Sequence, residues 1–253
     1  MNDLVRQRKM NRQTDFEKNL VFDSKASEKG VENEQKKPIE NKENLKESLN
    51  LDKSNTVKSE AKNLVEKPEM VCNDGCKYKG QWLGDLRHGK GTIEYTDGAV
   101  YTGDFANDVG EGKGRIVHAN GDKYEGDFVD GKAEGFGIFE GSNGNTYRGT
   151  WQDNKPHGKG IEHWDDGTEY TGSFQFGKKQ GRGVIKWTNG CTYEGDWHDN
   201  QMDGSGRYLW SNGMDYDGQW KAGKKSGKGV LKFPNGEVYQ GDFLEGKNHG
   251  TGK

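Results

Sequence analysis

Aromatic residues and glycines recur along the chain with a fixed period of 23 residues. A Tyr-x-Gly triplet starts at eight positions in the same phase, and another aromatic residue follows four residues after each tyrosine. These tyrosines are Tyr78, Tyr101, Tyr124, Tyr147, Tyr170, Tyr193, Tyr216 and Tyr239. Because side chains alternate between the two faces of a strand, the tyrosine, the glycine and the second aromatic share one face. We expect the eight tyrosines to be structural residues of the repeat.

A second strand and two turns complete each unit. Paired glycines stand eleven and thirteen residues after each tyrosine, from Gly89 and Gly91 onwards, and apolar residues follow with the same parity. Seven Asp-Gly or Asn-Gly steps, the first ending at Gly98, are typical of type I′ turns, whose central residues have positive φ. We expect these steps to join one unit to the next. The longer charged segment between each aromatic and the paired glycines would make the other turn.

These hairpins predict an all-β fold, an elongated single-layer antiparallel β-hairpin repeat array in which each unit contacts mainly its neighbours. Eight units cover residues 78–253, the last one incomplete. At ~4.8 Å per strand, sixteen strands span on the order of 70 Å. Natural sheets usually cover an open edge, so at the C-terminal edge we expect a partner, an end-to-end homodimer or a segment of the tail.

Two slots of the pattern hold residues that do not fit it. Glu162 takes an apolar slot in the fourth unit, and Gly141 takes an aromatic slot in the third. Either the sequence has drifted at these slots, or residues 140–163 form a local irregularity or a contact site.

Residues 1–70 have a different composition, with two aromatics, Phe16 and Phe22, and one glycine. Such a mixed-charge segment buries too little apolar surface to offset its ordering entropy. We therefore expect a disordered or partly helical N-terminal tail, followed by a linker at residues 71–77. Apolar residues near helical spacing within residues 15–22 indicate either a short docking helix or a solvated stretch of the tail.

The repeated residues closely resemble the MORN (membrane occupation and recognition nexus) repeat, through Tyr-x-Gly-x-Trp/Phe, His-Gly-x-Gly and Asp/Asn-Gly. The segments 88–91 and 157–160, both His-Gly-Lys-Gly, have its most typical form. The resemblance covers residues 78–253. It implies a binding scaffold at the cytoskeleton, including the ciliary axoneme, or at a membrane–cytoskeleton junction.

Nothing in the pattern indicates catalysis. The histidines are spread along the array without ligand spacing, and the Gly-x-Gly pairs lack the Gly-Lys-Ser/Thr that a phosphate-binding loop requires. Three cysteines fit neither a zinc site nor a disulfide framework. We expect no enzyme activity, no cofactor and no metal. A net charge of −3 gives no basic field for nucleic acid.

An aromatic stripe is the first candidate binding surface. One repeat position in four consecutive units holds Trp164, Trp187, Trp210 and Phe233. At two strands per unit these rings span ~30 Å. They either belong to the thin core or receive a partner protein, such as an amphipathic helix.

A row of cations is the second candidate. Between the paired glycines stand Lys90, Lys113, Lys159, Arg182 and Lys228. Such a row would attract anionic lipid, at ~1 kcal/mol per cation near a charged membrane. Acidic residues recur in the same array, so solvated surface charge is the other interpretation.

The sequence thus predicts a non-catalytic protein-interaction scaffold, cytoplasmic and, by resemblance, associated with the cytoskeleton or cilium. The alternatives are a peripheral phosphoinositide-binding membrane adaptor and a regulatory subunit of an enzyme on another chain.

Overall fold

The computed structural model describes residues 63–253, which form one antiparallel sheet of 17 strands. Each strand pairs with the next one along the chain, from β1 with β2 to β16 with β17. The strands are β1 (Val65–Val71), β2 (Lys77–Leu83), β3 (Leu86–Glu94), β4 (Val100–Ala106), β5 (Val109–Val117), β6 (Lys123–Val129), β7 (Lys132–Glu140), β8 (Thr146–Gln152), β9 (Lys155–His163), β10 (Glu169–Gln175), β11 (Lys178–Lys186), β12 (Thr192–His198), β13 (Gln201–Leu209), β14 (Asp215–Lys221), β15 (Lys224–Lys232), β16 (Val238–Leu244) and β17 (Lys247–Gly252). The predicted all-β hairpin array is confirmed.

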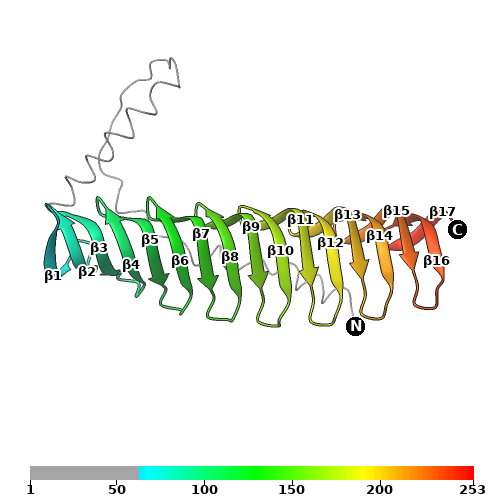
Figure 1. The fold of residues 1–253 in the computed structure, drawn as a ribbon, viewed down its shortest axis with the longest axis horizontal. Coiled ribbons are helices and arrows are strands. Elements are labelled where there is room, and N and C mark those ends of the chain that lie inside the picture. Colours follow the sequence, from blue (N-terminus) through cyan, green and yellow to red (C-terminus); the bar gives the residue numbers. More distant parts are fainter. Residues whose placement is uncertain (1–62) are drawn as a thin grey trace, which may run out of the picture.

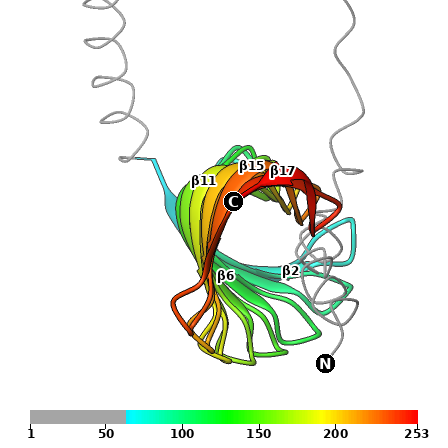
Figure 2. The same ribbon diagram turned by 90° about the vertical axis from the view of Figure 1, so that its right-hand side faces the viewer.

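The sheet is a long, coiled ribbon. Successive hairpins stack along one axis (Figure 1). Seen along that axis, the sheet is curved and its strands rotate progressively from β2 to β17 (Figure 2). This rotation is the accumulated twist of neighbouring strands, which has a fixed hand.

Each tyrosine ring lies over a glycine of the neighbouring strand. Gly149, two residues after Tyr147, faces Gly160 of β9 across the strand pair. A Cβ atom on Gly160 would lie 2.4 Å from the Tyr147 hydroxyl oxygen, so the ring needs glycine beneath it. The hydroxyl donates a hydrogen bond of 2.9 Å to the carbonyl of Thr150, three residues on. All eight tyrosines make this bond, which orients the ring within the core.

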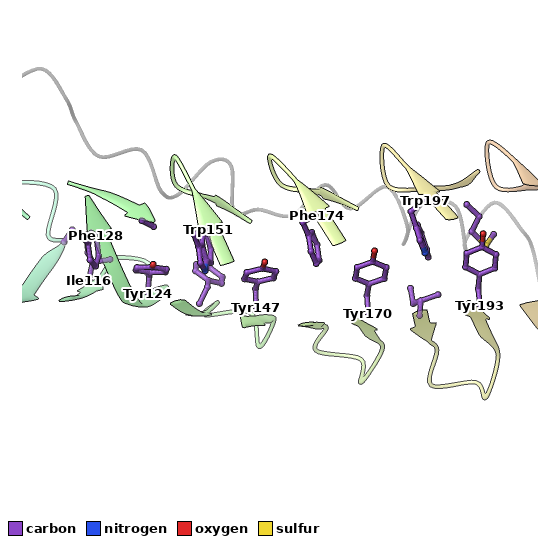
Figure 3. Close-up of a cluster of buried hydrophobic side chains, with 14 of the residues drawn as sticks. Ile116, Tyr124, Phe128, Tyr147, Trp151, Tyr170, Phe174, Tyr193 and Trp197 are labelled. Atoms are coloured by element: carbon purple, nitrogen blue, oxygen red, sulfur yellow. The ribbon is translucent and has the colours of Figure 1, made fainter. Parts of the chain in front are cut away.

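The aromatic rings interlock from unit to unit. Tyr147 meets Trp151 of its own unit and Phe174 of the next one edge to face, both with ring centroids 5.1 Å apart. In Figure 3 the tyrosines and the Phe or Trp rings point toward one another from opposite sides of the core. Edge-to-face pairs add about 0.5–1.5 kcal/mol each beyond their buried area. This aromatic core therefore joins neighbouring units as well as the strands within a unit.

The first glycine of each pair has a different role from the second. Gly158 has a φ of 71°, in the left-handed region that favours glycine. The pairing of β8 with β9 is irregular here, because Gly149 faces Gly160 but Trp151 faces Pro156. The extra residues form a bulge that bends the second strand.

The type I′ expectation is wrong for the Asp-Gly and Asn-Gly steps. In the turn after β9, only Gly167 has a positive φ, 82°, and its N–H donates to the Trp164 carbonyl at 2.9 Å. A glycine that follows a type I turn in this way is common in longer hairpin loops. The turns with two consecutive positive φ values lie inside the units instead, for example at Asp153 (49°) and Asn154 (63°). An Asp-Gly step suits either turn type, and the register of the flanking strands decides between them.

The array begins before the first tyrosine. Residues 65–71, which we expect from the sequence to be the end of the tail and the start of the linker, form β1 instead. Cys72–Cys76 makes the same five-residue turn as later units. The hydrogen bonds of β1 to β2 use the backbone, so this strand needs none of the repeat residues. Gly75 has a φ of 86° and follows Asp74, just as the glycine of each later turn of this kind follows Asp or Asn.

Candidate functional site

The sheet has a core face, which carries the aromatic rings, and a polar face on its other side. On the polar face of the outer units, a cation between the paired glycines meets a carboxylate of the next strand. Lys90 pairs with Asp104, Lys113 with Asp127 at 2.5 Å, and Lys228 with Asp242 at 2.8 Å. These cations of the predicted basic row are therefore compensated in place.

The centre of the polar face breaks this pairing. Phe136 stands where the first, second and seventh units have a lysine, and it faces Thr150. Lys159 faces Ser173, whose hydroxyl accepts its ammonium hydrogen bond at 2.8 Å. Thr150 and Ser173 occupy the repeat position that holds Asp104 or Asp127 elsewhere. Cations in the centre therefore lack the close carboxylates of the outer units.

Apolar side chains accompany this change. Ile138, Ile161 and Val184 occupy one repeat position of three consecutive units, and Arg148 lies between Ile138 and Ile161 on the strand that joins them. The Phe136 side chain is 45% exposed, and the Arg148 guanidinium lies 5.7 Å from its ring centre. Arg148 forms no ion pair within residues 63–253.

Phe136, Arg148, Ile161 and Val184 border a shallow groove of about 450 Å³, the central groove, and Ile138 is next to Phe136 on the same face. Backbone of Gly149, Gly160, Gly172 and Gly183 forms part of its floor, although a side chain on any of these glycines would point to the tyrosine rings of the core face. The groove is lined by Phe136, Arg148, Gly149, Lys159, Gly160, Ile161, Thr171, Gly172, Arg182, Gly183, Val184, Glu194 and Gly195. Arg182 keeps only a long contact of 3.7 Å to Asp196. The groove thus joins an apolar bed to three weakly compensated cations.

A family model for the MORN repeat matches eight consecutive segments of the chain: residues 78–100, 101–123, 124–146, 147–169, 170–192, 193–214, 216–238 and 239–253. The chain belongs to the MORN repeat family. A search of curated protein sequences finds no significant match.

Several solved structures, including three domains of SAS-4 and CPAP, are similar to this chain at low identity. The TCP domain of Drosophila melanogaster SAS-4, solved with a proline-rich motif of Ana2, is 15% identical with a TM-score of 0.39, over 69% of this chain and 88% of that one. The TCP10 domain of Danio rerio CPAP is 14% identical with a TM-score of 0.41, over 69% and 82%. The G-box domain of the microcephaly protein CPAP is 14% identical with a TM-score of 0.42, over 69% and 91%. Likenesses this distant give no ground for transferring what those domains bind.

The aromatic stripe of the MORN array lies on the core face, away from the central groove. Its four rings are half-buried against the core, each at the first position of a five-residue turn. Trp164 packs under the Lys179 ammonium at 4.6 Å, and Trp210 stacks on Tyr208 at 4.3 Å. The rings border the core and expose one side.

The eight MORN tyrosines lie within the core, and all but Tyr239 are buried. Burial raises the pKa of Tyr78 and of Tyr216 to about 12, so their hydroxyls stay protonated as donors. Of the predicted cations, only Lys159 and Arg182 line the groove.

Sequence reasoning missed the groove and one further residue. A signal for the groove exists in the sequence, since Phe136 interrupts the row of cations and Ile138, Ile161 and Val184 recur at one repeat position. Phe176, in a tight turn with a φ of 46°, is 45% exposed and was also missed. A bulky residue rarely adopts this backbone conformation, which makes the position a candidate contact site.

Within residues 63–253 no group of three or more His, Cys, Asp or Glu side chains could hold a metal ion. The same part of the chain has no helix that is long and apolar enough to cross a membrane. The docking helix expected within residues 15–22 lies outside the described residues.

Proposed function

We propose that this MORN array is a non-catalytic protein-interaction scaffold and that the central groove binds a segment of a partner protein. The carrying observation is that apolar and weakly compensated cationic side chains gather in consecutive units, whereas three other units keep a paired lysine and carboxylate at the same position.

The chemistry of the groove suits a protein partner. Arginine and aromatic side chains carry much of the energy in protein interfaces, and Arg148 stacked on Phe136 presents both together. The half-buried stripe of Trp164, Trp187, Trp210 and Phe233 is a second proposed surface, on the core face.

Protein binding is favoured over binding to anionic lipid. Lys90, Lys113 and Lys228 already pair with carboxylates, so the row offers less attraction than its count of cations suggests. The lipid adaptor, the regulatory subunit and an end-to-end dimer through β17 are the alternative proposals. Association with the cytoskeleton or a cilium is proposed from the family resemblance.

A pair of variants tests the groove. Phe136→Lys with Ile138→Thr gives the third unit the residues of the first, Lys90 and Thr92, and so should fold. Val230→Thr makes the same kind of change outside the groove. Full-length proteins are used for affinity capture from the source cells with quantitative mass spectrometry, and circular dichroism checks the fold.

We expect partners of the wild type to be retained by Val230→Thr and lost by the groove variant. Equal capture by all three proteins would refute the proposal. Co-sedimentation with phosphoinositide vesicles that is unaffected by the groove variant would favour the lipid alternative.

A further inference from the structure

We infer that the central groove binds residues 15–23 of the same chain when no partner occupies it. The groove sets the chemistry of its occupant. Arg148, Lys159 and Arg182 surround an apolar bed that includes Phe136 and Ile161. An occupant therefore needs carboxylates close to large apolar side chains.

Residues 15–23 have this composition. The segment reads Asp-Phe-Glu-Lys-Asn-Leu-Val-Phe-Asp, with three carboxylates, one lysine and four large apolar residues. It contains both aromatics of the first 70 residues, Phe16 and Phe22. Its net charge of −2 is opposite in sign to that of the groove lining, which holds three cations and one carboxylate, Glu194. Opposite charges at an interface guide association and fix its register.

The segment can reach the groove. The 41 residues that separate Asp23 from Val65 span at most ~140 Å when fully extended. From β1 to β9, at the middle of the groove, there are eight strand steps, or ~38 Å. A tethered segment binds at an effective concentration that its linker sets, so modest affinity suffices.

Residues 15–23 would regulate partner binding by the groove, so this inference rests on the proposed function. A partner segment would have to displace residues 15–23, so its apparent affinity would fall with the fraction of open groove. Any signal that releases the segment would then increase partner binding without changing the array.

Photo-crosslinking of the full-length chain tests the inference. Phe136 is replaced by the photoreactive analogue p-benzoylphenylalanine, and crosslinked peptides are mapped by mass spectrometry. Ser205, at the equivalent repeat position outside the groove, carries the same analogue as the matched control. We expect crosslinks within one molecule, concentrated in residues 13–25. Phe16→Asp with Phe22→Asp should reduce them to the level found at Ser205.

Three results would overturn the inference. The crosslinks could scatter along residues 1–62, they could fall on the other apolar–acidic stretch at residues 44–52, or they could join two molecules with a yield that rises with protein concentration. The last result would assign the groove to a second copy of the chain.

The two proposals fail separately. If partner capture depends on the groove but no crosslink reaches residues 13–25, the scaffold role stands and the internal occupant is wrong. If the crosslinks form but the groove variant captures the same proteins as the wild type, the internal occupant stands and the scaffold role of the groove is wrong. If both are right, Phe16→Asp with Phe22→Asp should capture more partner than the wild type.

Discussion

The Glu162–Lys179 ion pair tests how neighbouring units are held together. The Lys179 ammonium lies 2.7 Å from Glu162 Oε2, and both side chains are buried, Glu162 completely. Lys179 also lies over the rings of Trp164, at 4.6 Å, and Tyr170, at 5.1 Å. The other carboxylate oxygen of Glu162 has no hydrogen-bond partner among the described residues. This slot is the departure that the sequence placed near residues 140–163.

The equivalent junction one unit further on has Ile185 and Met202 in these two positions. Lys179→Met alone would leave the Glu162 carboxylate buried without its cation, which destabilises a protein by about 3–5 kcal/mol. Glu162→Ile alone would leave the Lys179 ammonium buried among aromatic rings without a carboxylate partner. The double variant copies the junction of the next units. We expect it to be near neutral or more stable by about 1–4 kcal/mol, because desolvation of both charges is avoided.

Urea unfolding followed by circular dichroism measures the four proteins of this cycle. Because repeat arrays can lose cooperativity, hydrogen exchange in β9 to β11 locates the change. The losses of unfolding free energy in the two single variants, added together, should exceed the loss in the double variant by about 3 kcal/mol or more. Losses that simply add would show that the two charges are not coupled, and the account of this junction would be wrong.

Three further changes test the packing, the turns and the charges. Gly160→Ala should destabilise the array by about 1–3 kcal/mol or more, since the new methyl group meets the Tyr147 ring; an unchanged melting temperature would contradict this packing. Phe176→Asn should raise the melting temperature, because asparagine tolerates a left-handed backbone better by about 1 kcal/mol. A lower melting temperature would mean that the contact of the Phe176 ring with the His157 imidazole contributes more than this backbone strain costs. Arg207 donates hydrogen bonds of 2.8 and 2.7 Å to Asp215 and lowers the pKa of that carboxyl. The pair therefore stabilises the fold above the ordinary carboxyl pKa, and this contribution is lost as the pH falls through the lowered pKa. Asp215→Asn should reduce the loss of stability on acidification in urea unfolding at graded pH, and an unchanged pH profile would argue against the pair.

The repeat, its strands and its buried face could be predicted from the sequence. Tyr147, Gly149 and Trp151 share a face because of strand alternation, which is a property of the local backbone. The demand for glycine under a ring is equally local, since it recurs at a fixed spacing in all units. Eight matched segments confirm this reading.

Local pattern could not decide the turns or the first strand. An Asp-Gly step fits two turn types, and the choice depends on how many residues the paired strands leave unpaired. Residues 65–71 carry no repeat signature. They form β1 because β2 offers it backbone hydrogen bonds, which do not depend on side chains.

Only the tertiary structure showed which charges on the polar face meet. Strand register makes neighbours of residues that are 14 positions apart in sequence, such as Lys113 and Asp127 or Lys159 and Ser173. The bulges at the positive-φ glycines help to set that register, so pairing cannot be read from composition or from a single unit. The sequence therefore determined the array and its aromatic core. The loss of compensated charge in the central groove emerged from the tertiary structure, because compensation depends on which side chains of neighbouring units face each other.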